Sequence, residues 1–280
     1  AKAEGRLHTV SEGPITGLGE GWWISPYTAK KHNLKTVDDI LKRPDLFPYS
    51  EDKSKGAFVG CPAGWGCQLA NANLFRANEM DKKGWVLVDP GSAAGLDGSM
   101  AKAVERGENW FGYYWSPTSM IGKYNMVPVP FGVPFAGSDN WDGCIVKSEQ
   151  ECADPKPSAW TKSEVNTVIT DRFKKAGGPA VDYLNNRIYP GAVMNGMLVY
   201  MSDNQAGGSD AAIEFLQKHG PQFGRRHARL ELFANKSLRV TLRVRRRLGL
   251  RLRLRLRLGL RLRLRRRLRS MLRRLFLGAF

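Results

Sequence analysis

Strand-like and helix-like segments alternate between residues 56 and 131, and this alternation limits the fold more than any other feature of the chain. Strand-forming residues bounded by turn residues predict strands over residues 56–60, 85–88, 110–115 and 127–131. Helical spacing of apolar side chains predicts helices over residues 68–80 and 99–106. Strands that alternate with helices are typical of α/β proteins with a largely parallel sheet.

The flanking segments extend this pattern. Ser25 and Pro26 predict a helix start, with a capping hydroxyl followed by proline at the first helical position. Thr36 predicts the cap of a second short helix, which ends before Pro44. Residues 132–159 are rich in Gly, Asp and Pro, so we expect a loop there. After this loop we predict a strand over residues 165–170 and helices over residues 179–187 and 210–219.

The net charge of +18 belongs to one end of the chain. Of the 44 Lys and Arg residues, 21 lie between Pro221 and Phe280, together with one of the 26 acidic residues. The preceding residues therefore hold 23 basic and 25 acidic side chains and are close to neutral. This distribution does not indicate a nucleic-acid-binding surface in the main part of the chain.

Residues 251–264 alternate Arg and Leu, with Gly259 as the departure from the alternation. A strand of this sequence has one apolar face and one face of like charges that repel each other. All eight tryptophans lie at or before Trp160, so the end of the chain also differs in composition. We interpret residues 221–280 as a low-complexity tail outside the fold, disordered or translated from a shifted frame. The alternative is a cationic arm that binds a membrane or a nucleic acid.

Four cysteines form two pairs that are close in sequence, Cys61 with Cys67 and Cys144 with Cys152. Neither pair has CxxC spacing, and no histidine lies near enough in sequence to suggest a zinc site. Two short loops that are each bracketed by cysteines fit disulfides formed in an oxidising compartment. Four reduced thiols in a cytosolic chain are the alternative.

The segment GCPAGWGC, residues 60–67, places a tryptophan in a glycine-rich loop directly before a predicted helix. The free N–H groups at a helix N-terminus bind carboxylates, and Gly66 lets a ligand approach the backbone closely. The indole face of Trp65 is a good partner for a quaternary ammonium group. A small ligand that carries a quaternary ammonium group and a carboxylate a few ångströms apart is a betaine. The alternative is that Trp65 only covers a small core.

A second aromatic segment, WFGYYW, occupies residues 110–115. Period-two alternation places Phe111, Tyr113 and Trp115 on the same face of this strand. Both faces of a buried strand can belong to the core. Because α/β sheets bind ligands at the C-terminal ends of their strands, Trp115 is the ligand candidate and Trp110 the core candidate.

The chain resembles the substrate-binding proteins of ABC importers for glycine betaine, proline betaine and choline in GCPAGWGC, SPYTAKKHNLKTVDDIL and GYYWSP followed by VPVPFGVPF. The resemblance covers about residues 5–220. It implies a type II periplasmic binding protein, whose two lobes close on a ligand and deliver it to a membrane permease and ATPase. Trp65 and Trp115 match cage tryptophans of that family, and Gly66 and Cys67 match residues whose N–H groups hold the ligand carboxylate.

The resemblance also implies a division into domains. We expect residues 1–20 to be the hinge and the end of a lobe I segment, and residues 21–131 to be a largely complete lobe II. Residues 132–220 would return to lobe I, and residues 221–280 would be the tail. The expected ligand is glycine betaine, with choline, proline betaine and trimethylamine N-oxide as alternatives, because one cage serves every methylated cation. We expect no cofactor and no nucleic-acid partner.

The expected location is the periplasm, or the cell exterior with a lipid anchor. No initiator Met and no signal sequence precede Ala1, and we expect part of lobe I, with a further cage aromatic, to be missing. No apolar run of about 18 residues occurs that could span a membrane. We therefore expect this chain to bind its ligand weakly or not at all.

Calcium binding and cysteine-based catalysis are two other interpretations of the sequence. Asp139, Asp142 and Asp154 surround the second cysteine pair and could hold calcium, but we expect a solvated acidic loop. An enzyme would use Cys61 or Cys67 as a nucleophile activated at a helix N-terminus. The four histidines lie in no supporting pattern, so we expect no catalysis.

Overall fold

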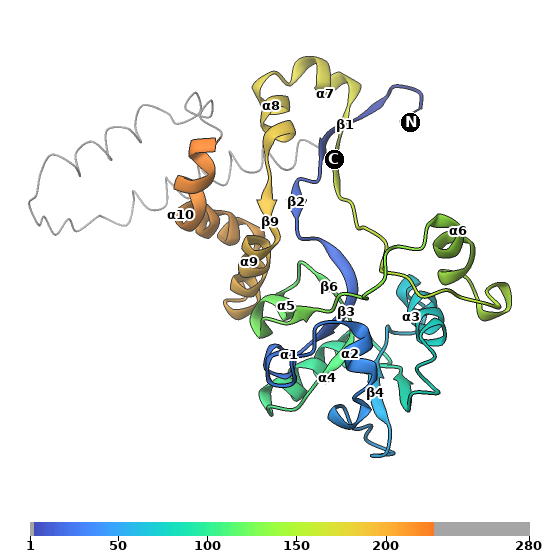
Figure 1. The fold of residues 1–280 in the computed structure, drawn as a ribbon. Helices are drawn as coiled ribbons and strands as arrows, with labels where there is room; N and C mark the ends of the chain where they lie inside the picture. Colours follow the sequence, from blue (N-terminus) through green and yellow to red (C-terminus); the bar gives the residue numbers. More distant parts are fainter. Residues whose placement is uncertain (1–2, 227–280) are drawn as a thin grey trace, which may run out of the picture. The chain divides into compact units, whose positions relative to one another are not determined.

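The computed structural model describes residues 3–226 (Figure 1). The chain divides into two compact units, one ending at Val199 and one beginning at Tyr200. The predicted tail lies outside the described residues, except for residues 221–226 at the end of helix α10 (Gly208–Arg226). No helix within residues 3–226 is both long enough and apolar enough to cross a membrane.

A five-stranded sheet lies in the first unit, with the strand order β5-β4-β6-β3-β7. Its strands are β3 (Gly19–Ile24), β4 (Gly56–Val59), β5 (Trp85–Val88), β6 (Phe111–Ser116) and β7 (Val127–Pro128). β4 runs parallel to β5 and β6, whereas β3 runs antiparallel to β6 and β7. The α/β class is confirmed, but the prediction of a largely parallel sheet is wrong. The sheet is mixed because β3, which we did not predict, enters it between β6 and β7.

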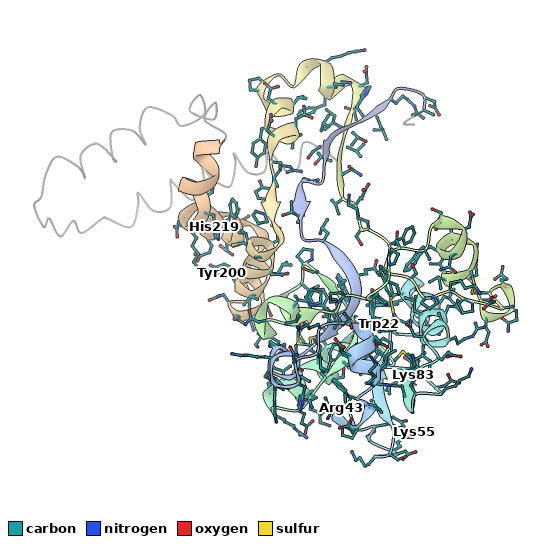
Figure 2. All side chains as sticks on the ribbon, viewed as in Figure 1. Trp22, Arg43, Lys55, Lys83, Tyr200 and His219 are labelled. Atoms are coloured by element: carbon teal, nitrogen blue, oxygen red, sulfur yellow. A yellow bond between two sulfur atoms is a disulfide. The ribbon has the colours of Figure 1, made fainter. Side chains whose placement is uncertain are left out.

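An aromatic cluster forms the centre of the core. Trp22, Phe58 and Phe111 come from three different strands, and none of them is more than 1% exposed. The ring centroid of Trp22 lies 4.6 Å from that of Phe58 and 5.7 Å from that of Phe111. Figure 2 shows Trp22 among the strands, whereas Lys55 lies at the surface. Because burial of apolar area is the main favourable term in folding, this cluster contributes strongly to the stability of the sheet.

Trp110 also belongs to the core, as predicted. It lies directly before β6, is 4% exposed, and donates its indole N–H to Ser99 Oγ over 3.0 Å. A Cβ atom at Gly112 would lie 2.9 Å from the Trp110 ring and 2.6 Å from the Val59 carbonyl oxygen. The glycine in this strand therefore makes room for the tryptophan beside it.

Helices connect the strands of the sheet. They are α1 (Pro26–His32), α2 (Val37–Leu41), α3 (Gly66–Ala77), α4 (Ala93–Glu105) and α5 (Ser119–Tyr124), with a 3₁₀ turn η1 (Pro44–Leu46). Thr36 and Asp39 form a capping box at α2, which confirms the predicted cap. Ser25 is the N-cap residue of α1, but its hydroxyl accepts from the Trp110 N–H over 3.1 Å and does not cap the helix, so the predicted capping hydroxyl is wrong.

Residues 132–159 form a loop, as expected, but this loop also contains three short helical turns that were not predicted. They are α6 (Ser138–Asn140), the π-helix η2 (Trp141–Ile145) and the 3₁₀ helix η3 (Glu149–Glu151). Helices of one turn bury too few residues to give the sequence an apolar period. Disulfides join Cys144 to Cys152, with a Cα–Cα distance of 4.5 Å, and Cys61 to Cys67, with 5.8 Å. Both predicted pairings are thus confirmed.

Two small sheets complete the first unit. β1 (Leu7–Glu12) pairs antiparallel with β8 (Asn166–Thr170), and β2 (Ile15–Thr16) pairs parallel with β9 (Tyr189–Pro190). The helices after β8 are α7 (Asp171–Ala176), α8 (Pro179–Asn186) and α9 (Gly191–Asp203). The predicted strand at 165–170 and helix at 179–187 are confirmed, and α10 extends the helix predicted at 210–219. The predicted domain boundaries stay predictions.

Candidate ligand-binding site

A cavity of about 610 Å³ lies where the end of β6 meets the start of α3. Four segments contribute to its wall: β3, the first disulfide loop with the start of α3, the end of β6, and residues 141–161. The lining residues are Glu20, Trp65, Gly66, Cys67, Leu69, Ala70, Tyr113, Trp115, Trp141, Val146, Trp160 and Thr161. The four residues predicted to bind ligand, Trp65, Gly66, Cys67 and Trp115, are all among them, so the fold brings them together.

The first disulfide closes the loop that carries Trp65. Trp65 is the N-cap residue of α3, and its side chain remains 37% exposed. Its backbone N–H donates to the Pro62 carbonyl over 3.2 Å, and the Gly64 N–H donates to Gln68 Oε1 over 2.9 Å. The disulfide and these hydrogen bonds hold the backbone in place, so the exposed ring stands on a fixed support.

The first two N–H groups of α3 lie at residues that line the cavity. Within the described part of the chain, the N–H groups of Gly66 and Cys67 have no hydrogen-bond acceptor. The first N–H groups of a helix lack acceptors in their own helix and lie at the positive end of its macrodipole. Because both residues line the cavity, the site offers paired donors to an anionic group.

Trp115 lies one residue before the end of β6. Its ring stacks on Tyr114, with a centroid distance of 4.6 Å and an interplanar angle of 11°. A second neighbour is Trp65, whose ring centroid is 5.7 Å away at an angle of 66°. Two rings at this angle form adjacent walls of a corner rather than the opposed walls of a sandwich.

Three aromatic residues of the cavity, Tyr113, Trp141 and Trp160, were not among the predicted ligand-binding residues. The Tyr113 ring lies 6.3 Å from Trp115 and 5.5 Å from Trp160. The Trp141 ring lies 5.3 Å from Trp160. With Trp65, these rings form a continuous row along the cavity. Tyr113 could have been predicted, because period-two alternation places it on the same strand face as Trp115. Trp141 and Trp160 lie outside strands, so no periodic pattern pointed to them.

Glu20 is the charged side chain among the described residues that line the cavity. It pairs with Trp115 in the register of β3 and β6, and its Oε2 accepts a hydrogen bond from the Tyr113 hydroxyl over 2.8 Å. Burial, together with this hydrogen bond, raises the pKa of Tyr113, so the hydroxyl remains a donor. The carboxylate favours a cation beside the rings. We did not predict Glu20 because we did not predict β3.

Three observations on the described residues bear on the alternative chemistries. Asp154 forms an ion pair with Lys156. No three His, Cys, Asp or Glu side chains within residues 3–226 lie close enough together to hold a metal ion. Cys61 and Cys67 are joined to each other, so neither sulfur is available as a thiolate nucleophile.

This chain is similar to known proteins that are described as binding betaines or choline. The model of the family "substrate binding domain of ABC-type glycine betaine transport system" matches residues 7–218. A curated relative, the glycine betaine/proline betaine-binding periplasmic protein of Salmonella typhimurium, is 25% identical over 126 residues. That match covers 44% of this chain and 37% of the relative, so the chain spans little more than a third of that protein's length.

Solved structures give matches of the same kind. One is an ABC-transporter choline-binding protein in complex with choline, with a TM-score of 0.46, 17% identity, and coverage of 79% of this chain and 66% of that one. Another is lactococcal OpuAC complexed with glycine betaine, with a TM-score of 0.46, 16% identity, and coverage of 79% and 71%. The family match spans well over half of the sequence. The chain therefore belongs to the family of substrate-binding domains of ABC-type glycine betaine transport systems.

Proposed function

We propose that this chain captures a small methylated ammonium osmolyte in the aromatic cavity between β6 and α3. Glycine betaine is the first candidate, and choline, proline betaine and trimethylamine N-oxide are the alternatives. The observation that carries the proposal is the row of five aromatic rings beside one carboxylate in a single cavity. A cavity lined in this way suits a quaternary ammonium group, whose nitrogen has no N–H and cannot donate a hydrogen bond.

The corner between Trp65 and Trp115 is the proposed cation site. Each indole face contributes about 0.5–2 kcal/mol to binding of a desolvated cation. The methyl groups of the ligand contact the rings directly, so part of the affinity comes from burial of apolar area. Glu20 adds a charge of opposite sign, and it keeps its place through the hydrogen bond from Tyr113.

The start of α3 is the proposed site for a ligand carboxylate. The Gly66 and Cys67 N–H groups supply donors without a cationic side chain, which would compete with the ligand ammonium for Glu20. Glycine betaine would thus use both the rings and the amides, whereas choline would use the rings alone. Removal of an amide donor should therefore weaken binding of glycine betaine and not that of choline.

We further propose that the whole protein works in the periplasm, or anchored outside the cell, and delivers its ligand to a permease and ATPase in the membrane. Family membership and the two disulfides, which fit an oxidising compartment, support this location. The expectation that this chain binds its ligand weakly or not at all stays a prediction. Micromolar binding of glycine betaine by residues 1–220, measured by calorimetry, would contradict it.

Gly66→Pro tests the carboxylate site. Gly66 is the first residue of α3, where proline fits the helix, and Trp65 before it has the extended backbone that proline favours. The substitution removes one N–H group, which is worth about 1.5–3 kcal/mol when it bonds a charged acceptor. We expect glycine betaine to bind roughly tenfold to a hundredfold more weakly, and choline to bind as before.

Gly66→Ala is the matched control, because alanine keeps the N–H group and a Cβ at this position meets no other atom within 4 Å. We expect Gly66→Ala to bind both ligands nearly as the unmodified chain does. Affinities are measured by NMR titration, which also detects weak complexes. An equal loss for choline and glycine betaine in Gly66→Pro would show that the amide does not contact a carboxylate.

A further inference from the structure

Residues 137–158, named here the clamped loop, supply one side of the cavity from outside the central sheet. Trp141 and Val146 of this loop line the cavity. Trp141 is 5% exposed, and its ring meets that of Trp160 at 5.3 Å and 67°. The clamped loop has only single turns of helix, so the position of Trp141 depends on contacts with the rest of the fold.

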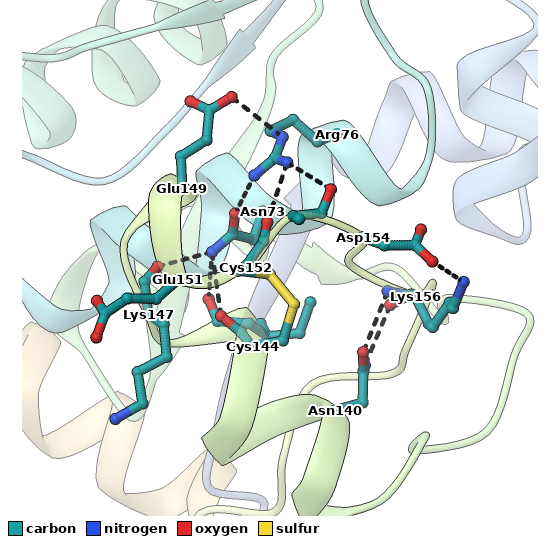
Figure 3. The surroundings of a disulfide bond; sticks show 12 residues. Asn73, Arg76, Asn140, Cys144, Lys147, Glu149, Glu151, Cys152, Asp154 and Lys156 are labelled. Atoms are coloured by element: carbon teal, nitrogen blue, oxygen red, sulfur yellow. Dashed lines mark hydrogen bonds and ion pairs between the residues drawn. A yellow bond between two sulfur atoms is a disulfide. The ribbon is translucent and has the colours of Figure 1, made fainter.

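Asn73, in α3, provides the first of these contacts (Figure 3). Its Nδ2 donates to the carbonyl oxygens of Lys147 over 2.9 Å, Ile145 over 3.0 Å and Cys144 over 3.3 Å. Asn73 is only 2% exposed. The last carbonyl groups of a helix lack N–H donors within it, so the buried Asn73 amide supplies a donor at the end of η2 that follows Trp141.

Arg76 lies on the same face of α3 and holds the other end of the clamped loop. Its Nη2 donates to the carbonyl oxygens of Cys152 over 3.0 Å and Ala153 over 3.2 Å. Its Nη1 donates to Asn73 Oδ1 over 2.8 Å, which fixes the orientation of the Asn73 amide. The second disulfide joins the two segments that these side chains hold, as Figure 3 shows.

We propose that Asn73 and Arg76 are positioning residues for the ligand: they hold the clamped loop on α3 so that Trp141 supports Trp160 as a wall of the cavity. This inference rests on the proposed function, because it assigns a wall of the same cavity. Trp160 lies outside any helix or strand, so its ring depends on its neighbours, Trp141 and Tyr113. α3 thus acts twice, through the amides at its start and through the side chains that hold the clamped loop.

A measurement without ligand tests the positioning. Indole rings as close as Trp141 and Trp160 give a near-ultraviolet circular dichroism signal that depends on fixed packing. The difference between the wild-type and Trp141→Phe spectra gives the part of this signal that depends on Trp141. We expect Asn73→Ala and Arg76→Ala each to reduce that same part. Asn78→Ala is the control, because Asn78 is the C-cap residue of α3 and its amide donates to the Leu74 carbonyl over 2.8 Å, not to the clamped loop. Wild-type spectra for both test variants would overturn the proposal.

A double-mutant cycle with choline and glycine betaine tests the effect on binding. We expect Trp141→Leu to weaken binding roughly twofold to thirtyfold, and Asn73→Ala to weaken it by a similar factor. Combining them should cause no further loss, because Asn73 acts through Trp141. In a Trp65→Leu background, Asn73→Ala should keep its full effect.

The outcomes of the two experiments are distinguishable. Additive losses for Asn73→Ala and Trp141→Leu would overturn the positioning role, since a side chain that only stabilises the fold would not depend on Trp141. If Asn73→Ala fails to fold, the same cycle with Arg76→Ala decides. If neither this chain nor the whole protein binds a methylated ammonium ligand, the proposed function fails, and the dichroism spectra alone decide the positioning.

Discussion

Replacement of Trp115 separates two contributions of its ring, attraction to a cation and apolar contact. Trp115→Phe keeps an aromatic face that attracts cations less strongly, and Trp115→Leu keeps only apolar volume. Choline and its neutral analogue, in which carbon replaces the ammonium nitrogen, have the same shape but differ in charge. We therefore expect the ratio of their affinities to fall in the order Trp, Phe, Leu.

The size of the effect follows from the geometry of the corner. Loss of one indole face costs about 0.5–2 kcal/mol, which is roughly a twofold to thirtyfold change in the choline dissociation constant. Trp65, 5.7 Å away, remains as the second face, so binding is weakened and not abolished. The stacking of Trp115 on Tyr114 contributes about 0.5–1.5 kcal/mol to the free energy of unfolding. This is small beside a typical stability of about 5–15 kcal/mol, so the variants should fold.

Trp110→Phe is the control at the other end of the same strand. Trp110 is buried and does not line the cavity, so its replacement should lower Tm and leave the affinity ratio unchanged. Both ligands are titrated against each variant, with Tm measured in parallel. Equal losses for choline and the neutral analogue in Trp115→Leu would refute a cation site at this ring.

Three further predictions concern the fold. Phe58→Ala, which empties a fully buried site against Trp22, should lower the free energy of unfolding by about 3–5 kcal/mol in denaturant titrations; a loss below about 1 kcal/mol would contradict the core described here. Hydrogen bonds from the Lys35 N–H and from Thr36 lower the pKa of Asp39 below its ordinary value. Its carboxylate therefore stabilises the fold above that ordinary value and loses this effect as pH falls through the lowered pKa. Asp39→Asn should thus be less stable than the unmodified chain at pH 7 and approach it in acid, and a pH-independent difference would argue against the capping box. Thiol titration should find no free thiol before reduction and four afterwards, whereas free thiols in the native protein would contradict the disulfides.

The sequence allowed part of the site to be predicted, for physical reasons that the structure makes clear. Trp65 lies in a loop whose glycines and paired cysteines are local signals, and the helix that follows has a clear apolar period. Trp115 lies at the end of a strand, where period-two alternation assigns its face. Each signal involves residues that are close in sequence, so no knowledge of distant contacts is needed.

The remaining part of the site depends on contacts between distant residues. β3 pairs with β6 across about ninety residues, and its sequence GEGWWI contains glycines that disfavour a strand assignment. Glu20 was missed for that reason. Trp141 owes its place to Asn73, which is far from it in sequence and has no pattern of its own. Tertiary contacts, and not local propensity, bring these residues to the cavity.

The central claim is that this cavity binds a methylated cation through its rings. The most direct test is an NMR titration of the chain with choline, glycine betaine, trimethylamine N-oxide and the neutral analogue of choline. The indole N–H signals of Trp65 and Trp115, assigned with Phe variants, report on the site. We predict that at least one methylated ammonium ligand shifts both signals, and that the neutral analogue shifts them less at every concentration. Equal shifts with the neutral analogue, or shifts confined to other tryptophans, would contradict the account.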